Sequence, residues 1–237
     1  VGHIGNQFKF FAGSGLLTCS WNCCASETKA EMNDCEIAFR VLLDEARSFL
    51  NRQVPEALNF CTGSIFEELA LRQPMAQRLP MFEQIPQCLD LANSSTLPLL
   101  RALAGANQFL EWQQSYTLAD GFDSHYLANY GWFNLISPDG PYRSPNVRLS
   151  FGYWNRGLYY KEHWHEPEEM YVPLAGRALF HSQGTAAREC GPGDVVRHHS
   201  NQPHAIDMVP GPLLALAIWR GPNLNRKSDL PPARPAG

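Results

Sequence analysis

Two histidines and a glutamate stand close together in this chain, in the order His163, His165 and Glu169, with the spacing H-x-H-x3-E. Gly157 lies six residues before the first histidine and Gly176 seven residues after the glutamate, so glycines bound the stretch on both sides. In a regular β-strand alternate side chains share a face, which predicts that the three side chains point the same way. Two imidazoles and a carboxylate on one face suit a divalent first-row metal ion.

A fourth ligand is expected further along the chain. Gly193 opens a second segment, and His204 follows it by eleven residues. The combined pattern is G-x5-H-x-H-x3-E-x6-G followed by G-x10-H, which is far more specific than a lone His-x-His pair. By ligand type, the expected cofactor is one divalent transition metal ion (Zn, Fe, Mn, Co or Ni). The predicted metal ligands are His163, His165, Glu169 and His204.

The remaining histidines are assigned no ligand role. His198 and His199 are expected to be exposed turn residues, and His181 follows Gly176 without a partner nearby. Exposed strand or turn histidines are the ordinary alternative for any such residue. We therefore restrict the predicted metal site to the four residues of the two spaced motifs.

Composition limits the partners of this chain. The 237 residues are 44% hydrophobic with a formal net charge of −4, and no stripe of Lys and Arg is present, which argues against a nucleic-acid partner. No apolar run approaches the roughly 20 residues that a membrane-spanning helix needs. We expect a small-molecule substrate, no nucleic acid and no membrane, and we leave a homodimer open.

Cysteine usage indicates the cellular compartment. Seven cysteines with irregular spacing do not form a disulfide framework, and Cys19, Cys23 and Cys24 lack a second pair that would complete a zinc site. Residues 8–19 loosely resemble the apolar part of a signal peptide, but a Gly-Ser-Gly sequence interrupts them. Secretion is therefore the less favoured alternative, and we expect a cytoplasmic protein.

The chain divides into four regions by its sequence pattern. Residues 1–30 form an irregular lead, and residues 31–124 form a helical region with expected helices over 33–52, 55–72, 79–92 and 97–117. From 125 to 222 short aromatic and β-branched runs alternate with turn residues, which is typical of an antiparallel sandwich or barrel. Within it, the run 213–219 is apolar on both faces and suits a central strand. Residues 223–237, with three prolines, are expected to be a disordered tail.

The paired motifs closely resemble those of the cupins. The resemblance implies a mainly β fold, the cupin double-stranded β-helix (an antiparallel β-barrel or jelly roll), with an α-helical layer before it. Tyr171 lies two residues after Glu169 and therefore on the expected metal face. A free phenol has a pKa of about 10, and a nearby cation favours the phenolate, which makes a tyrosine base feasible. The alternative is a hydrogen-bonded tyrosine of the barrel wall.

Additional residues make the resemblance more specific. A Tyr three residues before the first motif histidine, the sequence H-x-H-x3-E-x-Y and a Trp fifteen residues after the later histidine are similar to the bacterial cupin-type dimethylsulfoniopropionate (DMSP) lyases. The matching residues are Tyr160, His163, His165, Glu169, Tyr171, His204 and Trp219.

The resemblance implies a metal-dependent carbon–sulfur lyase that forms dimethyl sulfide and acrylate by β-elimination. It implies that the metal binds the substrate carboxylate and that Tyr171 or Tyr160 removes the Cα proton. It also implies that Trp219 and Tyr160 bind the substrate, with the indole holding the sulfonium through cation–π attraction.

Some alternatives stay open on the sequence. Tyr160 has the opposite strand parity to His163, so it reaches the site only if the strand bulges, and Tyr159 is its competitor. A lyase-like cupin could act on a different small carboxylate. A non-catalytic metal-containing cupin could bind a small ligand or serve in storage, because one fold hosts many functions.

Overall fold

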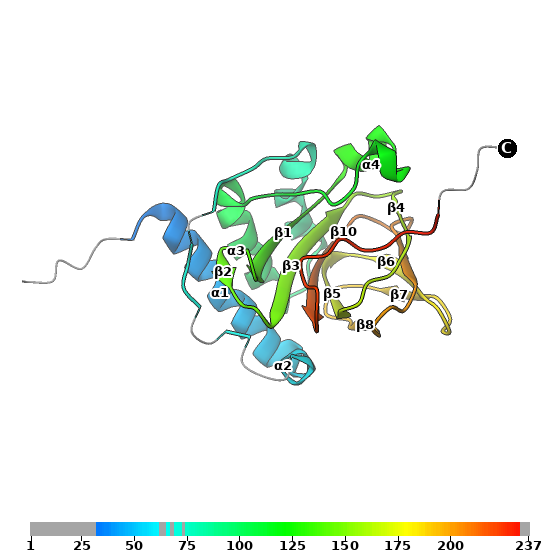
Figure 1. Ribbon diagram of the computed structural model, residues 1–237. Coiled ribbons are helices and arrows are strands. Elements are labelled where there is room, and N and C mark those ends of the chain that lie inside the picture. The colour runs from blue at the N-terminus through cyan, green and yellow to red at the C-terminus, as the bar shows by residue number, and fades with distance from the viewer. Residues whose placement is uncertain (1–31, 62–64, 67–68, 73, 233–237) are drawn as a thin grey trace, which may run out of the picture. The chain divides into compact units, whose positions relative to one another are not determined.

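The structure is a computed structural model that describes residues 32–61, 65–66, 69–72 and 74–232. The predicted irregular lead, the segment similar to a signal peptide and the first three cysteines lie outside the described residues. From Met32 onwards the chain forms a single unit. Its helices come first in the sequence and its strands follow (Figure 1).

Helix α1 (Asp34–Gln53) begins at a capping box. Asn33 and Glu36 exchange hydrogen bonds between side chain and backbone, each 3.0 Å long, which satisfies two N–H groups at the start of the helix. The buried face of α1 packs on α3 (Leu97–Ala106). The other helical elements are shorter: α2 (Pro55–Phe60), η1 (Pro80–Gln84), η2 (Pro86–Leu91), η3 (Asn107–Phe109), η4 (Leu118–Asp120) and α4 (Ser124–Ala128).

The helix predicted over 33–52 is confirmed. The helices predicted over 55–72 and 97–117 are too long, and the single helix predicted over 79–92 is wrong. α2 ends at Phe60. Residues 79–92 form the two 3-10 helices η1 and η2, because Pro86 has no N–H to donate to an α-helix. α3 ends at Ala106, since Gln113 further along exchanges backbone hydrogen bonds of 2.7 and 3.0 Å with Trp132.

Two sheets form the β part of the fold. In the described residues the larger sheet has the order β2-β1-β3-β10-β5-β8 and the smaller one β4-β9-β6-β7. All strand pairs are antiparallel except β1 with β2. The strands are β1 (Tyr130–Ser137), β2 (Tyr142–Arg143), β3 (Val147–Trp154), β4 (Tyr159–His163), β5 (Glu168–Gly176), β6 (Ala178–Ser182), β7 (Arg188–Cys190), β8 (Val196–His198), β9 (His204–Asp207) and β10 (Leu213–Arg220).

Two apolar clusters lie on opposite faces of the larger sheet. One joins the helices to the sheet and includes Leu214, Leu216 and Ile218 of β10. The other lies between the sheets and includes Ala215 and Ala217 of the same strand. Figure 1 shows helices α1 and α3 on one side of β1, β3 and β10, with β6 and β7 on the other. The prediction of a central strand that is apolar on both faces is confirmed, because β10 pairs with β3 and β5.

The connection between β4 and β5 differs from the single regular strand that the sequence pattern predicts. β4 ends at His163 in the smaller sheet, and β5 begins at Glu168 in the larger one. Pro167, which has no N–H for a ladder hydrogen bond, lies in the connection. His163 and Glu169 therefore face the same space from two sheets, and strand parity is not what brings them together.

The C-terminal segment is the other departure from expectation. Residues 223–232, which were expected to belong to a disordered tail, pack on the β part of the fold. Leu224 is only 4% exposed, and the backbones of Asp229 and Trp164 exchange hydrogen bonds of 2.8 and 3.1 Å. The burial of Leu224 and this pairing order the segment despite its prolines. No described helix is long and apolar enough to cross a membrane.

Candidate metal centre and adjoining cavity

The four predicted ligands come together between the two sheets. His163 ends β4 opposite His204 at the start of β9, where the two residues are register partners. His165 lies in the β4–β5 connection, and Glu169 is the second residue of β5. All four side chains are buried, with Glu169 at 0% exposure. The four side chains are thus close enough to be tested as ligands of one metal ion, and that role stays a prediction.

The three motif histidines share one hydrogen-bond arrangement. The Nδ1 atoms of His163, His165 and His204 each lie 2.8 Å from a backbone carbonyl oxygen. A carbonyl only accepts hydrogen bonds, so each Nδ1 must carry the proton. When such a ring is neutral, its Nε2 is left with a lone pair, which is the form in which imidazole binds a metal ion.

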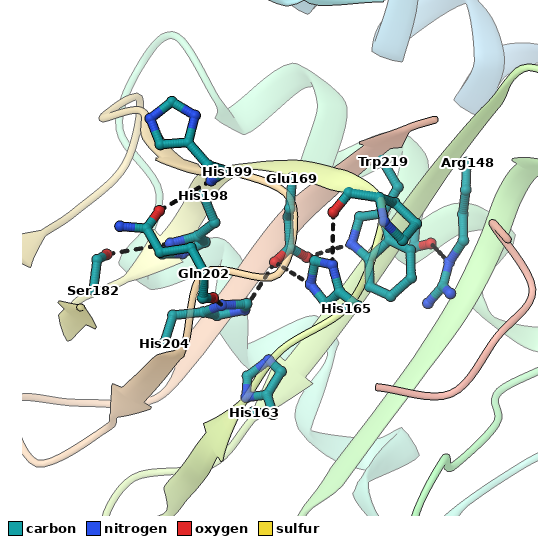
Figure 2. A network of polar contacts seen from close by, with 12 residues as sticks. Arg148, His163, His165, Glu169, Ser182, His198, His199, Gln202, His204 and Trp219 are labelled. Carbon is teal, nitrogen blue, oxygen red and sulfur yellow. Dashed lines mark hydrogen bonds and ion pairs between the residues drawn. The ribbon is translucent and has the colours of Figure 1, made fainter. Parts of the chain in front are cut away.

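These lone pairs meet a carboxylate. Nε2 of His165 lies 3.1 Å and Nε2 of His204 3.2 Å from Oε2 of Glu169, as the dashed lines in Figure 2 show. One ligand atom from each of the three histidines falls within 4.8 Å of the others. A nitrogen lone pair and a carboxylate at this distance repel unless a cation, either a proton or a metal ion, lies between them. The cluster could hold a metal ion, and its nitrogen and oxygen donors fit a divalent transition metal.

Burial and neighbouring side chains together shift the pKa values of two residues in the cluster. Burial lowers the pKa of His163 well below its ordinary value, helped by the neighbouring His204. For Glu169 burial acts to raise the pKa, but His165, and then His204, outweigh it and hold the pKa well below its usual range. A neutral imidazole beside an ionised carboxylate is the ligand state that a divalent cation requires.

His198 is a fifth buried residue of this cluster that the sequence analysis missed. It is only 2% exposed, and its ring stacks on that of His204 at 3.9 Å with an interplanar angle of 10°. Its Nδ1 lies 3.2 Å from the Ser182 hydroxyl. Burial lowers the pKa of His198 to about 3. The expectation that His198 is an exposed turn residue is therefore wrong, because β8 pairs with β5 and places His198 opposite Glu169. The neighbouring His199 is exposed, as expected.

Both candidate tyrosines are buried beside the cluster. The β4–β9 register shifts between Tyr160 and His163, which is the bulge that Tyr160 needs in order to reach the site. Its ring stacks on His163 at 3.9 Å, whereas Tyr159 is 50% exposed. Burial, and then the nearby Glu169 carboxylate, raises the pKa of Tyr171 well above its ordinary value. Burial also raises that of Tyr160.

Trp219 already has two protein groups against its indole. Its indole stacks on the His165 ring at 4.0 Å, and the Arg148 guanidinium lies 4.2 Å from its ring centroid. Trp219 also lines the adjoining cavity. Its Nε1–H donates to Oε1 of Glu169 at 2.5 Å. The cation–π role of Trp219 stays a prediction, and its hydrogen bond also lets Trp219 orient a predicted ligand (Figure 2).

A cavity of about 260 Å³ adjoins the cluster. Its lining includes Glu169, Tyr171 and residues 225–228 of the C-terminal segment. Aromatic rings and polar groups both contribute to its lining, which suits a small ligand with a charged group. Other lining residues are Ser115, Tyr130, Trp132, Asn134, Asp139, Arg148, Ser150, Trp154, Tyr160 and Trp219.

Fold and site together define a cupin: a mainly β protein with N-terminal helices and a buried histidine–carboxylate cluster between its sheets. The family model for dimethylsulfoniopropionate lyase matches residues 61–215. The chain is also 30% identical over 190 residues to dimethylsulfoniopropionate lyase DddQ of Ruegeria pomeroyi, a match over 80% of this chain and 92% of the relative. The chain therefore belongs to the DMSP lyase family.

Solved structures agree with this assignment. A chain from the crystal structures of the DMSP lyases RdDddP and RnDddQII aligns with a TM-score of 0.78 and 34% identity, over 83% of this chain and 99% of that one. The crystal structure of DMSP lyase DddQ from Ruegeria pomeroyi DSS-3 aligns with a TM-score of 0.75 and 29% identity, over 82% and 96% of the two chains. The helices before the barrel are thus part of the shared fold.

Proposed function

We propose that this chain cleaves dimethylsulfoniopropionate to dimethyl sulfide and acrylate in a metal-dependent β-elimination. The proposal is supported by the family and, above all, by one observation: imidazole lone pairs and a carboxylate converge beside two buried tyrosines at the end of a small cavity. This reaction needs a base that removes the Cα proton. It also needs a pocket for the sulfonium group, from which neutral dimethyl sulfide departs.

In this proposal His163, His165, Glu169 and His204 hold the metal ion. Their fit rests on the protonated Nδ1 atoms, which leave each Nε2 free to bind. When bound, a divalent ion supplies positive charge that favours a nearby phenolate and stabilises negative charge on a carboxylate substrate.

Tyr171 is the preferred base. Burial and Glu169 raise its pKa, so it needs a compensating cation to ionise, and its neighbourhood holds the predicted metal site. The phenolate takes the Cα proton, the electron pair of that C–H bond forms the Cα–Cβ double bond, and the Cβ–S bond breaks with its pair on sulfur. The products are acrylate and neutral dimethyl sulfide. Tyr160, which donates to or accepts from the Tyr116 hydroxyl at 2.9 Å, is the alternative base.

A second group of rings, besides Trp219, is assigned to the sulfonium. Trp154 lies 5.8 Å from Tyr130 and 5.7 Å from Tyr160 between ring centroids, and all three rings line the cavity. Aromatic faces attract a desolvated cation by roughly 0.5–2 kcal/mol each. As dimethyl sulfide forms, the positive charge disappears and this attraction is released.

The test is release of dimethyl sulfide from purified, metal-loaded protein given dimethylsulfoniopropionate. Tyr171→Phe keeps the ring and removes the hydroxyl, so we expect a folded, metal-loaded protein whose turnover falls by about 10²–10⁴-fold. Tyr160→Phe is the matched variant. If Tyr171→Phe keeps more than about a tenth of the activity, well outside that range, Tyr171 is not the base, and Tyr160 and metal-bound water are the remaining candidates. A wild-type protein that binds metal but releases no dimethyl sulfide would point to another small carboxylate substrate or to a binding role.

A cytoplasmic location is also proposed. It is supported by Cys35, Cys61, Cys88 and Cys190, which are free thiols in the described residues, as is usual in a reducing compartment. Alkylation of the native protein without prior reduction should modify the accessible thiols. A disulfide among them after purification under air-free conditions would contradict the proposal.

A further inference from the structure

Three cationic side chains line the cavity beside the metal cluster, and they differ in how their charge is balanced. Arg226 pairs with Asp229 at 2.8 Å, and Lys227 pairs with Asp120 at 2.6 Å. Arg148 has no carboxylate within 4.0 Å among the residues that the structure describes. It is therefore the cavity cation whose charge the described protein leaves unpaired.

The guanidinium of Arg148 is held firmly. Nε–H donates to the Ser150 hydroxyl at 3.0 Å, and that hydroxyl lies 2.7 Å from the side-chain oxygen of Asn134. Nη1 donates to the carbonyl of Leu224 in the C-terminal segment at 3.2 Å. The plane lies over Trp219 at 4.2 Å and over Trp132 at 4.7 Å. Two hydrogen bonds and two aromatic rings fix its position before any ligand arrives.

Part of the guanidinium stays available. Arginine has five N–H groups, and only the Nε–H and one Nη1–H are used. The remaining Nη1–H and the two Nη2–H groups form the end of the fork, which matches the two oxygens of a carboxylate. Burial lowers the pKa of Arg148 from its ordinary value, although Glu169 acts in the opposite sense. A partly buried, unpaired cation of this kind gains from an incoming anion.

We propose that Arg148 binds the carboxylate of the substrate and so sets its orientation in the cavity. This inference rests on the proposed function and refines it, because the resemblance assigns the carboxylate to the metal alone. A substrate that carries a carboxylate and a sulfonium is attracted at one end and repelled at the other by the same guanidinium. The sulfonium therefore lies away from Arg148, toward Trp154 in the same cavity, and the carbons between the two groups lie near Tyr171.

The test measures binding of two probes to metal-loaded protein by calorimetry: acrylate, which is an anion, and the trimethylsulfonium ion. A bidentate, charge-assisted pair is among the stronger hydrogen-bonded contacts, so we expect Arg148→Gln to weaken acrylate about 10–100-fold and trimethylsulfonium less than about twofold. Arg148→Lys, which keeps the charge but loses the fork, should give an intermediate loss. Acrylate affinity within about twofold of wild type in either variant overturns the proposal.

Arg226→Gln is the matched comparison, because it removes a cation that also lines the cavity but already has a carboxylate partner; it should weaken acrylate far less than Arg148→Gln does. An equal loss there would mean that only the overall charge of the cavity matters, which also overturns the assignment to Arg148. If circular dichroism shows that Arg148→Gln does not fold, Arg148→Lys and Ser150→Ala test the proposal instead. Ser150→Ala only removes the acceptor of the Arg148 Nε–H, and it should weaken acrylate binding. The probes bind without turnover, so this assay tests the Arg148 subsite even if the protein releases no dimethyl sulfide. A protein that releases dimethyl sulfide while Arg148→Gln binds acrylate normally would contradict the subsite alone.

Discussion

Replacing Trp219 by phenylalanine isolates the single hydrogen bond that this residue gives to the metal cluster. The Nε1–H donates to Oε1 of Glu169 at 2.5 Å, and both side chains are buried, at 5% and 0% exposure. Phenylalanine keeps an aromatic ring against His165 and Arg148. The change therefore removes a charge-assisted donor while it retains most of the packing.

The loss should fall mainly on the metal-loaded protein. Without metal, a proton shared between Oε2 of Glu169 and Nε2 of His165 or His204, which lie 3.1 and 3.2 Å away, can still balance the carboxylate. With metal bound, those nitrogens are engaged and Oε1 is left without a donor. A hydrogen bond to a buried charged group contributes about 1.5–3 kcal/mol. At about 1.4 kcal/mol per tenfold change, metal affinity should fall roughly 10–150-fold.

Competition with a chromophoric chelator measures this affinity. Trp132→Phe is the control, because Trp132 also lies over Arg148 at 4.7 Å, while its buried Nε1 has no hydrogen-bond partner among the described residues. We expect Trp132→Phe to bind metal like the wild type. If Trp219→Phe also binds within about twofold of wild type, the hydrogen bond does not support the ligand and the reasoning is refuted.

Three further outcomes are expected. His204→Ala should lose stoichiometric metal by elemental analysis; full occupancy would show that the fourth ligand is misassigned. Because the pKa of His198 falls from 6.5 to about 3 on folding, the unfolded chain binds the extra proton between these values. The free energy of unfolding of metal-free protein should thus fall by up to about 1.4 kcal/mol per pH unit from pH 6.5 toward pH 3. A His198→Asn variant whose free energy of unfolding changes with pH as steeply as that of the wild type in this window would contradict the prediction. Gly176 has φ +73°, and a Cβ there would lie 1.7 Å from the Pro212 carbonyl oxygen, so Gly176→Ala should destabilise by more than about 2 kcal/mol; an unchanged melting temperature would refute that clash.

The sequence predicts the parts of the site that depend on local spacing. The two spaced motifs lead to His163, His165, Glu169 and His204, and the structure brings these side chains together. The reason is not the one given by strand parity, since the ligands come from two sheets and a connection that contains Pro167. Strand parity also predicts that Tyr160 reaches the site only if the strand bulges before His163, and the register shift in β4 is such a bulge.

What the sequence does not predict depends on contacts between distant segments. His198 becomes buried because β8 pairs with β5, and Trp219 is contacted by residues 54 and 71 positions away in the chain, His165 and Arg148. Residue type alone makes Trp219 a good cation site, and only the packing shows that an arginine already uses its ring. The same holds for the segment after Asn223, whose composition predicts disorder while its neighbours order it.

The C-terminal segment has a consequence for the effect of salt. It forms part of the cavity wall, and Lys227–Asp120 and Arg226–Asp229, with partly or largely exposed side chains, are among its attachments. Ions screen such exposed pairs strongly, whereas they reach a buried cluster little. Rising ionic strength should therefore loosen the wall and speed exchange of ligands with solvent while the metal stays bound. Exchange rates that do not respond to salt would show that Leu224 and the backbone pairing hold the wall without help from these charges.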